Sequence, residues 1–200
     1  MSAPPQNSPS ERFVTLATAF DLDGPVLQVA PLGAGLINTT LSVRTAAGGR
    51  YVLQRLNRQV FPDPAAVMQN LRRVTAHLAG VGVPTLELIR TRGGADWLQA
   101  DPGETWRCTR YLAHSRVWQD APDPGVAYRA ACAFGRFAAA LADLPAPRLH
   151  ETIPGFHDTP ARLQALREAI AADRCGRVRE AARESDAVLQ RAAAAEVLQA

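Results

Sequence analysis

The sequence predicts an α+β protein in which a small antiparallel sheet comes first and helices follow. Short stretches of alternating apolar residues occupy the first 112 residues, and turn-forming glycines and prolines separate them. One amphipathic helix interrupts these stretches, and from residue 123 onward the pattern becomes helical and rich in alanine. Because sheet and helices occupy separate parts of the chain, we expect two lobes with a cleft between them.

Three strands are predicted at the start of the sheet. Val26–Leu32 is a short apolar run, and Leu36–Thr45 places Ile, Thr, Leu and Val on one face by alternation. Residues 46–49, Ala-Ala-Gly-Gly, supply the positive φ angles that a tight hairpin needs, and Tyr51–Leu53 follows as the third strand. Together they predict an antiparallel meander.

A helix is predicted after these strands. Asp63 is its expected N-cap, Pro64 suits its first position, and Gly80 ends it, with apolar residues at helical spacing between. Two further strands are predicted over Thr85–Thr91 and Thr105–Leu112, and Trp97–Leu98 is a candidate for pairing within the turn-rich segment that separates them.

The second part of the chain predicts three helices, over Gly125–Leu144, Thr159–Asp173 and Val178–Ala200. Thr159 is the expected N-cap of the second helix because Pro160 follows it.

Composition favours a soluble cytoplasmic protein. The net charge of +3 comes from 22 basic and 19 acidic residues that are spread along the chain, so we expect no nucleic-acid partner. No apolar stretch is long enough for a signal peptide or a membrane span, so no membrane partner is expected. The three cysteines lack the spacing of a disulfide framework or a zinc site. Residues 1–14, rich in proline and serine, predict a disordered tail.

The order of these elements, with a glycine turn between the first two strands, resembles the N-terminal lobe of a protein-kinase-like fold. Three segments are more specific: "PLGAGLINTTLSVRT", "RYVLQRLNRQVFPDPAAVMQNLRRVTAHL" and "IPGFHDTPARLQALREAI". They resemble the aminoglycoside-phosphotransferase family, and within it the branch that contains N-acetylhexosamine 1-kinases. The resemblance covers about residues 25–175. It implies a nucleotide-covering N-lobe over residues 15–112 and a partial helical C-lobe over residues 113–200.

The resemblance implies an ATP- and magnesium-dependent kinase that phosphorylates a hydroxyl of a sugar or aminosugar. In this family the base and the metal ligands come from an H-x-D-x-x-x-x-N-type loop and a later aspartate, and this sequence contains neither. We therefore interpret the chain as truncated before the catalytic loop, with no catalytic residue or metal ligand of its own. The alternative is a non-catalytic nucleotide- or sugar-binding module.

The glycine turn is the first candidate nucleotide site. Gly33, Ala34 and Gly35 begin a kinase-like G-x-G-x-x-G pattern, in which bare backbone N–H groups approach phosphates without a Cβ in the way. Asn38 takes the place of the third glycine, and its side chain tolerates a left-handed backbone. We expect this turn to cover the phosphates of ATP.

The third strand supplies the second candidate. The resemblance places Gln54 where a kinase has its phosphate-bridging lysine, and Arg55 would serve instead if strand register turned it inward. The following helix contains no glutamate, and the nearest polar residues are Gln69 and Asn70. A neutral Gln–Asn pair is therefore expected to replace the usual Lys–Glu pair.

The end of the last strand is the third candidate. The resemblance implies that backbone groups of residues 110–113 contact the adenine edge, which makes Tyr111 and Leu112 nucleotide-binding residues. Leu32 and Val52 would complete an apolar slot for the ring with Tyr111.

Overall fold

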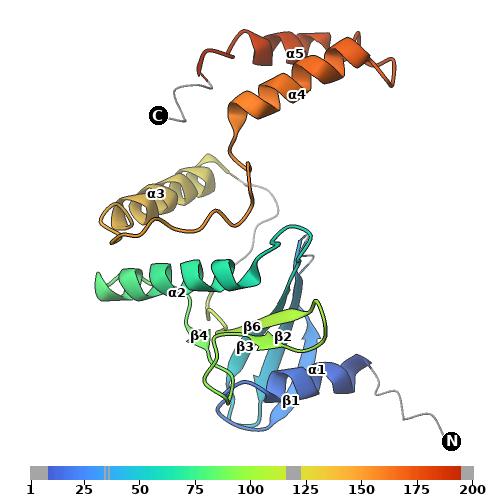
Figure 1. The fold of residues 1–200 in the computed structure, drawn as a ribbon. Helices are drawn as coiled ribbons and strands as arrows, with labels where there is room; N and C mark the ends of the chain where they lie inside the picture. Colours follow the sequence, from blue (N-terminus) through green and yellow to red (C-terminus); the bar gives the residue numbers. More distant parts are fainter. Residues whose placement is uncertain (1–8, 34, 36, 116–122, 195–200) are drawn as a thin grey trace, which may run out of the picture. The chain divides into compact units, whose positions relative to one another are not determined.

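We describe the chain from a computed structural model, which covers residues 9–33, 35, 37–115 and 123–194. Its helices and strands, shown in Figure 1, are α1 (Pro9–Thr18), β1 (Val26–Pro31), β2 (Thr39–Thr45), β3 (Arg50–Leu56), α2 (Pro64–Gly80), β4 (Leu88–Ile89), β5 (Leu98–Gln99), β6 (Thr105–Arg110), α3 (Pro124–Ala140), α4 (Thr159–Ala172) and α5 (Ala182–Leu189). The α+β class and the order of sheet before helices are confirmed.

The contacts divide the chain into two compact units, Met1–Thr152 and Ile153–Ala200. The first unit contains the whole sheet, α1, α2 and α3, and the second contains α4 and α5. The lobe boundary that the sequence predicts after residue 112 stays a prediction.

The sheet is antiparallel and follows the order β1-β2-β3-β6-β4, with β5 also paired to β6. The meander of β1, β2 and β3 arises because Gly48, at φ +88°, closes the turn between β2 and β3. Strand β2 begins at Thr39, three residues later than predicted, because the preceding residues form the glycine turn. The meander itself is confirmed.

Two sets of side chains alternate along the central strands. One set forms the core with α1: Leu41 and Val43 of β2 and Leu53 of β3 are buried together with Phe20, which follows the helix. The other set, which lies on the opposite face of the sheet, carries several polar side chains. This division matters for the site, because neighbouring residues of one strand face different surroundings.

Helix α1 corrects the prediction of a disordered tail over residues 1–14. The helix begins at Pro9, and Phe13 packs against the core with its ring centroid 5.9 Å from that of Trp106. The sequence did not predict this helix, because proline- and serine-rich residues precede its apolar positions. Residues 1–8 lie outside the described part of the chain.

The predicted N-cap of α2 agrees with the structure, whereas that of α4 is displaced by one residue. Asp63 caps α2, since its Oδ1 accepts a hydrogen bond from the Ala66 N–H at 3.1 Å. The N-cap of α4 is Asp158 rather than Thr159, because the carboxylate of Asp158 accepts from the Ala161 N–H at 2.9 Å. The predicted last helix is shorter within the described residues, where α5 ends at Leu189.

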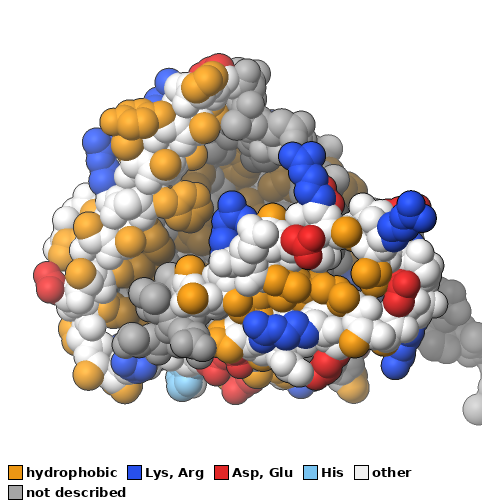
Figure 2. All heavy atoms as spheres, turned by 90° about the horizontal axis from the view of Figure 1, so that it is seen from above, with side chains coloured by type: hydrophobic (Ala, Val, Ile, Leu, Met, Phe, Trp, Pro, Cys, Tyr) orange, Lys and Arg blue, Asp and Glu red, His pale blue; other side chains and the backbone are white. Residues whose placement is uncertain are grey.

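Charged side chains of both signs are mixed on the surface. On the face drawn in Figure 2, arginine side chains lie near acidic ones, and apolar side chains lie among them. In the part of the chain that is described, no helix combines the length and the apolar character needed to cross a bilayer.

Candidate functional site

The turn between β1 and β2 depends on both of its described glycines. Gly33 has φ +70°, a left-handed conformation that disfavours other residues. Gly35 is needed for a different reason: a Cβ there would lie 2.7 Å from the carbonyl oxygen of Asn38. The Leu32 N–H donates to the Thr40 carbonyl at 2.9 Å, which closes the base of the turn. Ala34 lies outside the described residues.

Asn38 anchors this turn to the end of β3. Its Oδ1 accepts a hydrogen bond from the Asn57 N–H at 2.9 Å, and the Asn57 side chain donates back to the Ile37 carbonyl at 3.2 Å. The Asn38 side chain is therefore occupied by the protein scaffold, and its expected contribution to nucleotide binding would come from its backbone.

A row of polar side chains crosses the sheet on the face opposite α1. Register pairs Thr40 with Gln54 and Gln54 with Arg107. The Gln54 amide donates to Thr40 Oγ1 at 3.0 Å, and its Oε1 accepts from Arg107 Nε at 3.1 Å and Nη2 at 2.7 Å. We call Thr40, Gln54 and Arg107 the polar row.

Arg107 is a residue that sequence reasoning missed. It lies within the predicted last strand, but nothing local distinguishes it from Arg110 three residues on. Its position beside Gln54 depends on the pairing of β3 with β6, which are about fifty residues apart in the chain. The alternation of side chains along a strand could have distinguished the two arginines, because it puts Arg107 and Arg110 on opposite faces of the strand.

Arg55 faces the α1 side of the sheet. It pairs across the strands with Thr39 and Trp106, donates to Glu104 Oε1 at 2.9 Å, and has its Cζ 6.0 Å from the Trp106 ring centroid. Glu104 also forms an ion pair with Arg12 of α1. The opposite orientation of Gln54 and Arg55 therefore leaves Arg55 engaged with a carboxylate, on the side away from the polar row.

A small hollow of about 250 Å³ lies on this Arg55 side. Its lining comes from the residues after the glycine turn, the end of β3 and the β5–β6 turn, and includes Ile37, Arg55, Asn57 and Glu104. Gln54 and Arg107 are not part of its lining.

Glu104 gives the sheet a pH-dependent stability. Burial raises the pKa of its carboxyl, but the hydrogen bonds from Trp106 and Arg55 and the charges of Arg12 and Arg55 outweigh burial, so the pKa falls below its ordinary value of 4.5. A lowered pKa in the folded state means that the stabilisation is present above the unfolded pKa and is lost as pH falls through the folded one.

We therefore expect Glu104→Gln to lower the free energy of unfolding by about 1–2 kcal/mol at pH 7, since it removes charge-assisted hydrogen bonds. The difference in the free energy of unfolding between the variant and the unaltered chain should shrink as the pH falls below about 4. Urea titrations followed by tryptophan fluorescence at several pH values would measure it. Asp101→Asn is the control, because Asp101 is 62% exposed and pairs only with Arg12 among the described residues. A constant difference from pH 7 to pH 3 would contradict the assignment.

Helix α2 uses its polar residues to hold the segment that follows α3. The Asn70 side chain exchanges two hydrogen bonds of 2.8 Å with the backbone of His150, and Gln69 Oε1 lies 2.8 Å from His150 Nε2. Arg73 Nη2 donates to the carbonyls of Pro145 and Pro147, each at 2.6 Å. The expected Gln–Asn pair is therefore wrong: Gln54 bonds to Thr40 and Arg107 instead.

Tyr111 continues the ladder just beyond β6. Its N–H donates to the Arg50 carbonyl at 3.0 Å, and the Arg50 Cζ lies 3.9 Å from the centre of its ring. Alternation places Tyr111 and Val52 on the face of the polar row. Leu112 is 53% exposed, and its carbonyl accepts from Ser115 Oγ at 2.8 Å. Tyr111 and Val52 thus share the face on which Gln54 lies, whereas Leu112 is on the open surface.

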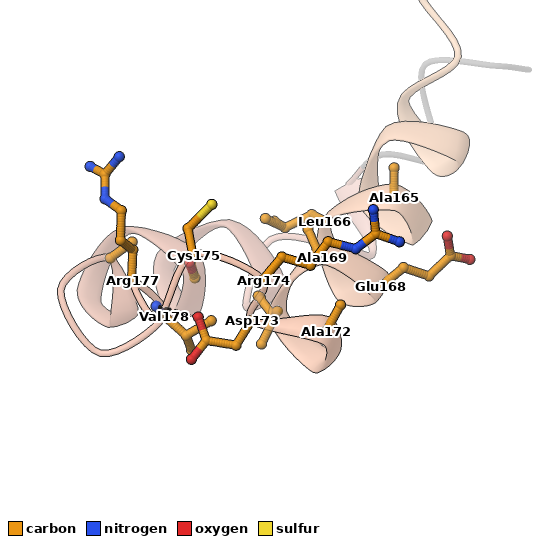
Figure 3. Close-up of a pocket in the computed structure, with 13 residues that line it drawn as sticks. Ala165, Leu166, Glu168, Ala169, Ala172, Asp173, Arg174, Cys175, Arg177 and Val178 are labelled. Carbon is orange, nitrogen blue, oxygen red and sulfur yellow. Dashed lines mark hydrogen bonds between the residues drawn. The ribbon is translucent and has the colours of Figure 1, made fainter.

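The second unit contains a separate pocket of about 600 Å³, shown in Figure 3. Its walls come from α4 and the segment that leads to α5, and are mostly alanine, leucine, isoleucine and valine. Arg174, Arg177 and Glu168 are among its charged residues. None of the predicted nucleotide residues lines it.

The described residues contain no group of three or more His, Cys, Asp or Glu side chains placed to hold a metal ion. Four carboxylates near the sheet have partners within the chain instead of a metal ion. Asp63 caps a helix, Glu104 and Asp96 pair with arginines, and Glu87 pairs with Arg110.

An antiparallel sheet with one long helix after its third strand, a two-glycine turn between the first strands and a partial set of helices after them define a kinase-like α+β protein. A model of the phosphotransferase enzyme family (APH) matches residues 28–200. The chain belongs to this family, which confirms the family resemblance drawn from the sequence, whereas the N-acetylhexosamine 1-kinase branch stays a prediction.

Solved structures show the same fold at low identity. An amicoumacin kinase in complex with AMP-PNP, Ca2+ and Ami matches 82% of this chain at 14% identity and a TM-score of 0.57. An aminoglycoside phosphotransferase from Alicyclobacillus acidocaldarius matches 86% at 16% identity, with a TM-score of 0.53. A spectinomycin phosphotransferase in complex with ADP and spectinomycin matches 90% at 10% identity, with a TM-score of 0.54. The match covers 54%, 46% and 57% of those chains, so this chain spans about half their length.

Proposed function

We propose that this chain is the nucleotide-binding part of an ATP-dependent phosphotransferase that acts on a hydroxyl of a sugar or aminosugar. The observation that carries the proposal is the turn from Gly33 to Asn38, in which a left-handed glycine and a glycine without room for a Cβ occupy the loop between β1 and β2. Family membership and neighbours solved with AMP-PNP or ADP support it.

The residues of the sheet fit a nucleotide triphosphate. Within the described part of the chain, the N–H groups of Gly33 and Gly35 bind no other residue, so they are available to phosphate oxygens. Gln54 has a second amide N–H besides the one that it donates to Thr40, and Val52 and Tyr111 offer apolar surface for the adenine ring on the face of Gln54. ATP would supply the phosphoryl group that is transferred.

Magnesium belongs to the proposal as a partner of ATP rather than of this chain. Phosphoryl transfer uses a divalent ion to neutralise the phosphates. Because the sequence lacks an H-x-D-x-x-x-x-N-type loop, and Asp63, Glu87, Asp96 and Glu104 serve as a cap or in ion pairs, we assign the metal ligands and the general base to residues outside these 200.

A non-catalytic nucleotide- or sugar-binding module is the second candidate. The same commitment of the carboxylates to caps and ion pairs favours it, since a base that takes a hydroxyl proton must be free to approach the acceptor. A nucleotide-binding module would share the nucleotide site with the kinase and differ from it in turnover.

Two measurements test the proposal. Calorimetric titration of the purified chain with AMP-PNP should give saturable binding that requires the triphosphate, and absence of binding would overturn the kinase and the nucleotide-binding form of the module. An ADP-release assay with N-acetylglucosamine, N-acetylgalactosamine and spectinomycin as separate acceptors then distinguishes them. Turnover with a sugar supports the kinase and its sugar acceptor, turnover with spectinomycin alone supports the kinase with a different acceptor, and binding without turnover supports the module.

A further inference from the structure

Arg107 lies at the end of the polar row with one protein partner. Its Nε and Nη2 both donate to Gln54 Oε1, at 3.1 and 2.7 Å, and the side chain is partly buried. A guanidinium carries further N–H groups in the same plane. Among the described residues these further groups have no acceptor, so the edge of the guanidinium not turned to Gln54 is available to a ligand.

The charge of Arg107 is also uncompensated by the described residues. On the opposite face of the sheet, toward α1, Arg55 pairs with Glu104 and Arg110 pairs with Glu87. Arg107 forms no ion pair with any described carboxylate, and burial lowers the pKa of its guanidinium. A partly buried cation beside a neutral amide is destabilising unless an anion reaches it.

The sequence makes this cation more significant, because its 200 residues contain no lysine at all. A triphosphate needs a positive charge beside the turn that covers it. Gln54, at the position where the resemblance places the lysine of a kinase, is neutral, and Arg55 faces the α1 side with Glu104. Arg107 brings a charge to the face of Gln54 from the neighbouring strand.

We propose that Arg107 supplies the cation that binds the phosphate oxygens of the nucleotide, and that Gln54 positions it. This inference rests on the proposed nucleotide function and adds the residue that provides the charge. A guanidinium presents two parallel N–H groups to a phosphate, which a single ammonium does not. Gln54 Oε1 restrains Nε and Nη2, so the orientation of the remaining edge is fixed before a ligand arrives.

The test compares ATP, adenosine and inorganic tripolyphosphate as ligands of the unaltered chain, Arg107→Met, Arg107→Lys and Arg90→Met. Arg107→Met should weaken ATP and tripolyphosphate binding by about tenfold to a hundredfold, the loss expected for charge-assisted hydrogen bonds, and leave adenosine binding within about twofold. Arg107→Lys should bind ATP and tripolyphosphate with intermediate affinities, because lysine keeps the charge but lacks the two parallel N–H groups of a guanidinium. Arg90→Met removes an arginine that is 66% exposed and pairs with Asp96, and it should change none of the affinities.

The outcomes separate the two proposals. Equal ATP affinity in Arg107→Met and the unaltered chain overturns the role of Arg107 but leaves the nucleotide site. Tripolyphosphate binding that depends on Arg107 without ATP binding keeps the anion site and overturns the nucleotide function. Binding of neither ligand by the unaltered chain overturns both. Circular dichroism checks that each variant folds. If Arg107→Met does not fold, the ratio of ATP affinity to adenosine affinity in Arg107→Lys tests the role of Arg107 instead. A ratio equal to that of the unaltered chain contradicts the role.

Discussion

Replacing Phe20 by alanine should lower the free energy of unfolding of the sheet unit by about 3–5 kcal/mol, the usual cost of removing a fully buried aromatic ring. The ring is 0% exposed and lies in the core with Leu41, Leu53 and Trp106, where α1 meets the sheet. The surrounding strands are held by register and can collapse only partly into the space that remains. Urea unfolding followed by tryptophan fluorescence would measure the change.

Phe134→Ala provides the matched control, because it makes the same change on α3 at a ring that is 76% exposed. We expect its effect to stay within about 0.5 kcal/mol. Similar losses in the two variants would contradict the placement of Phe20 in the core. A small effect of Phe20→Ala would show that α1 and its end do not contribute to the folded sheet.

Gly35→Ala should weaken ATP binding by about tenfold or more, which corresponds to at least about 1.4 kcal/mol. An added Cβ would lie 2.7 Å from the Asn38 carbonyl oxygen, which is backbone and cannot swing aside as a side chain can. The turn must therefore open, and its N–H groups move away from the positions that the proposed phosphate site requires. Calorimetric titration with AMP-PNP would measure the loss.

The control for this prediction is Gly48→Ala, at the turn between β2 and β3. Gly48 has φ +88° and no atom within 4 Å of an added Cβ, so alanine there costs strain, of order 1–2 kcal/mol, without a clash. It should lower stability and leave nucleotide affinity unchanged. If Gly35→Ala lowered stability alone, the turn would be a structural feature rather than a phosphate site.

Local features were predicted well from the sequence. The meander, the helix capped by Asp63 and the alanine-rich helices depend on residues close together in the chain, such as a carboxylate three residues before the N–H that it caps. The family could be predicted for a related reason, since its characteristic segments are continuous. Errors occurred where a local signal was ambiguous, as with the start of α1 and with the cap of α4, where Asp158 and Thr159 are both good N-cap residues.

Local patterns in the sequence were enough to predict the strands, the glycine turn and the alternation that separates Gln54 from Arg55. Which of these two residues faces away from α1 could not be predicted in this way, because it depends on where the core and α1 lie in the folded chain. The same is true of the position of Arg107 beside Gln54. Strand pairing across about fifty residues is set by how the whole sheet buries its apolar face, and no short segment of sequence contains that information.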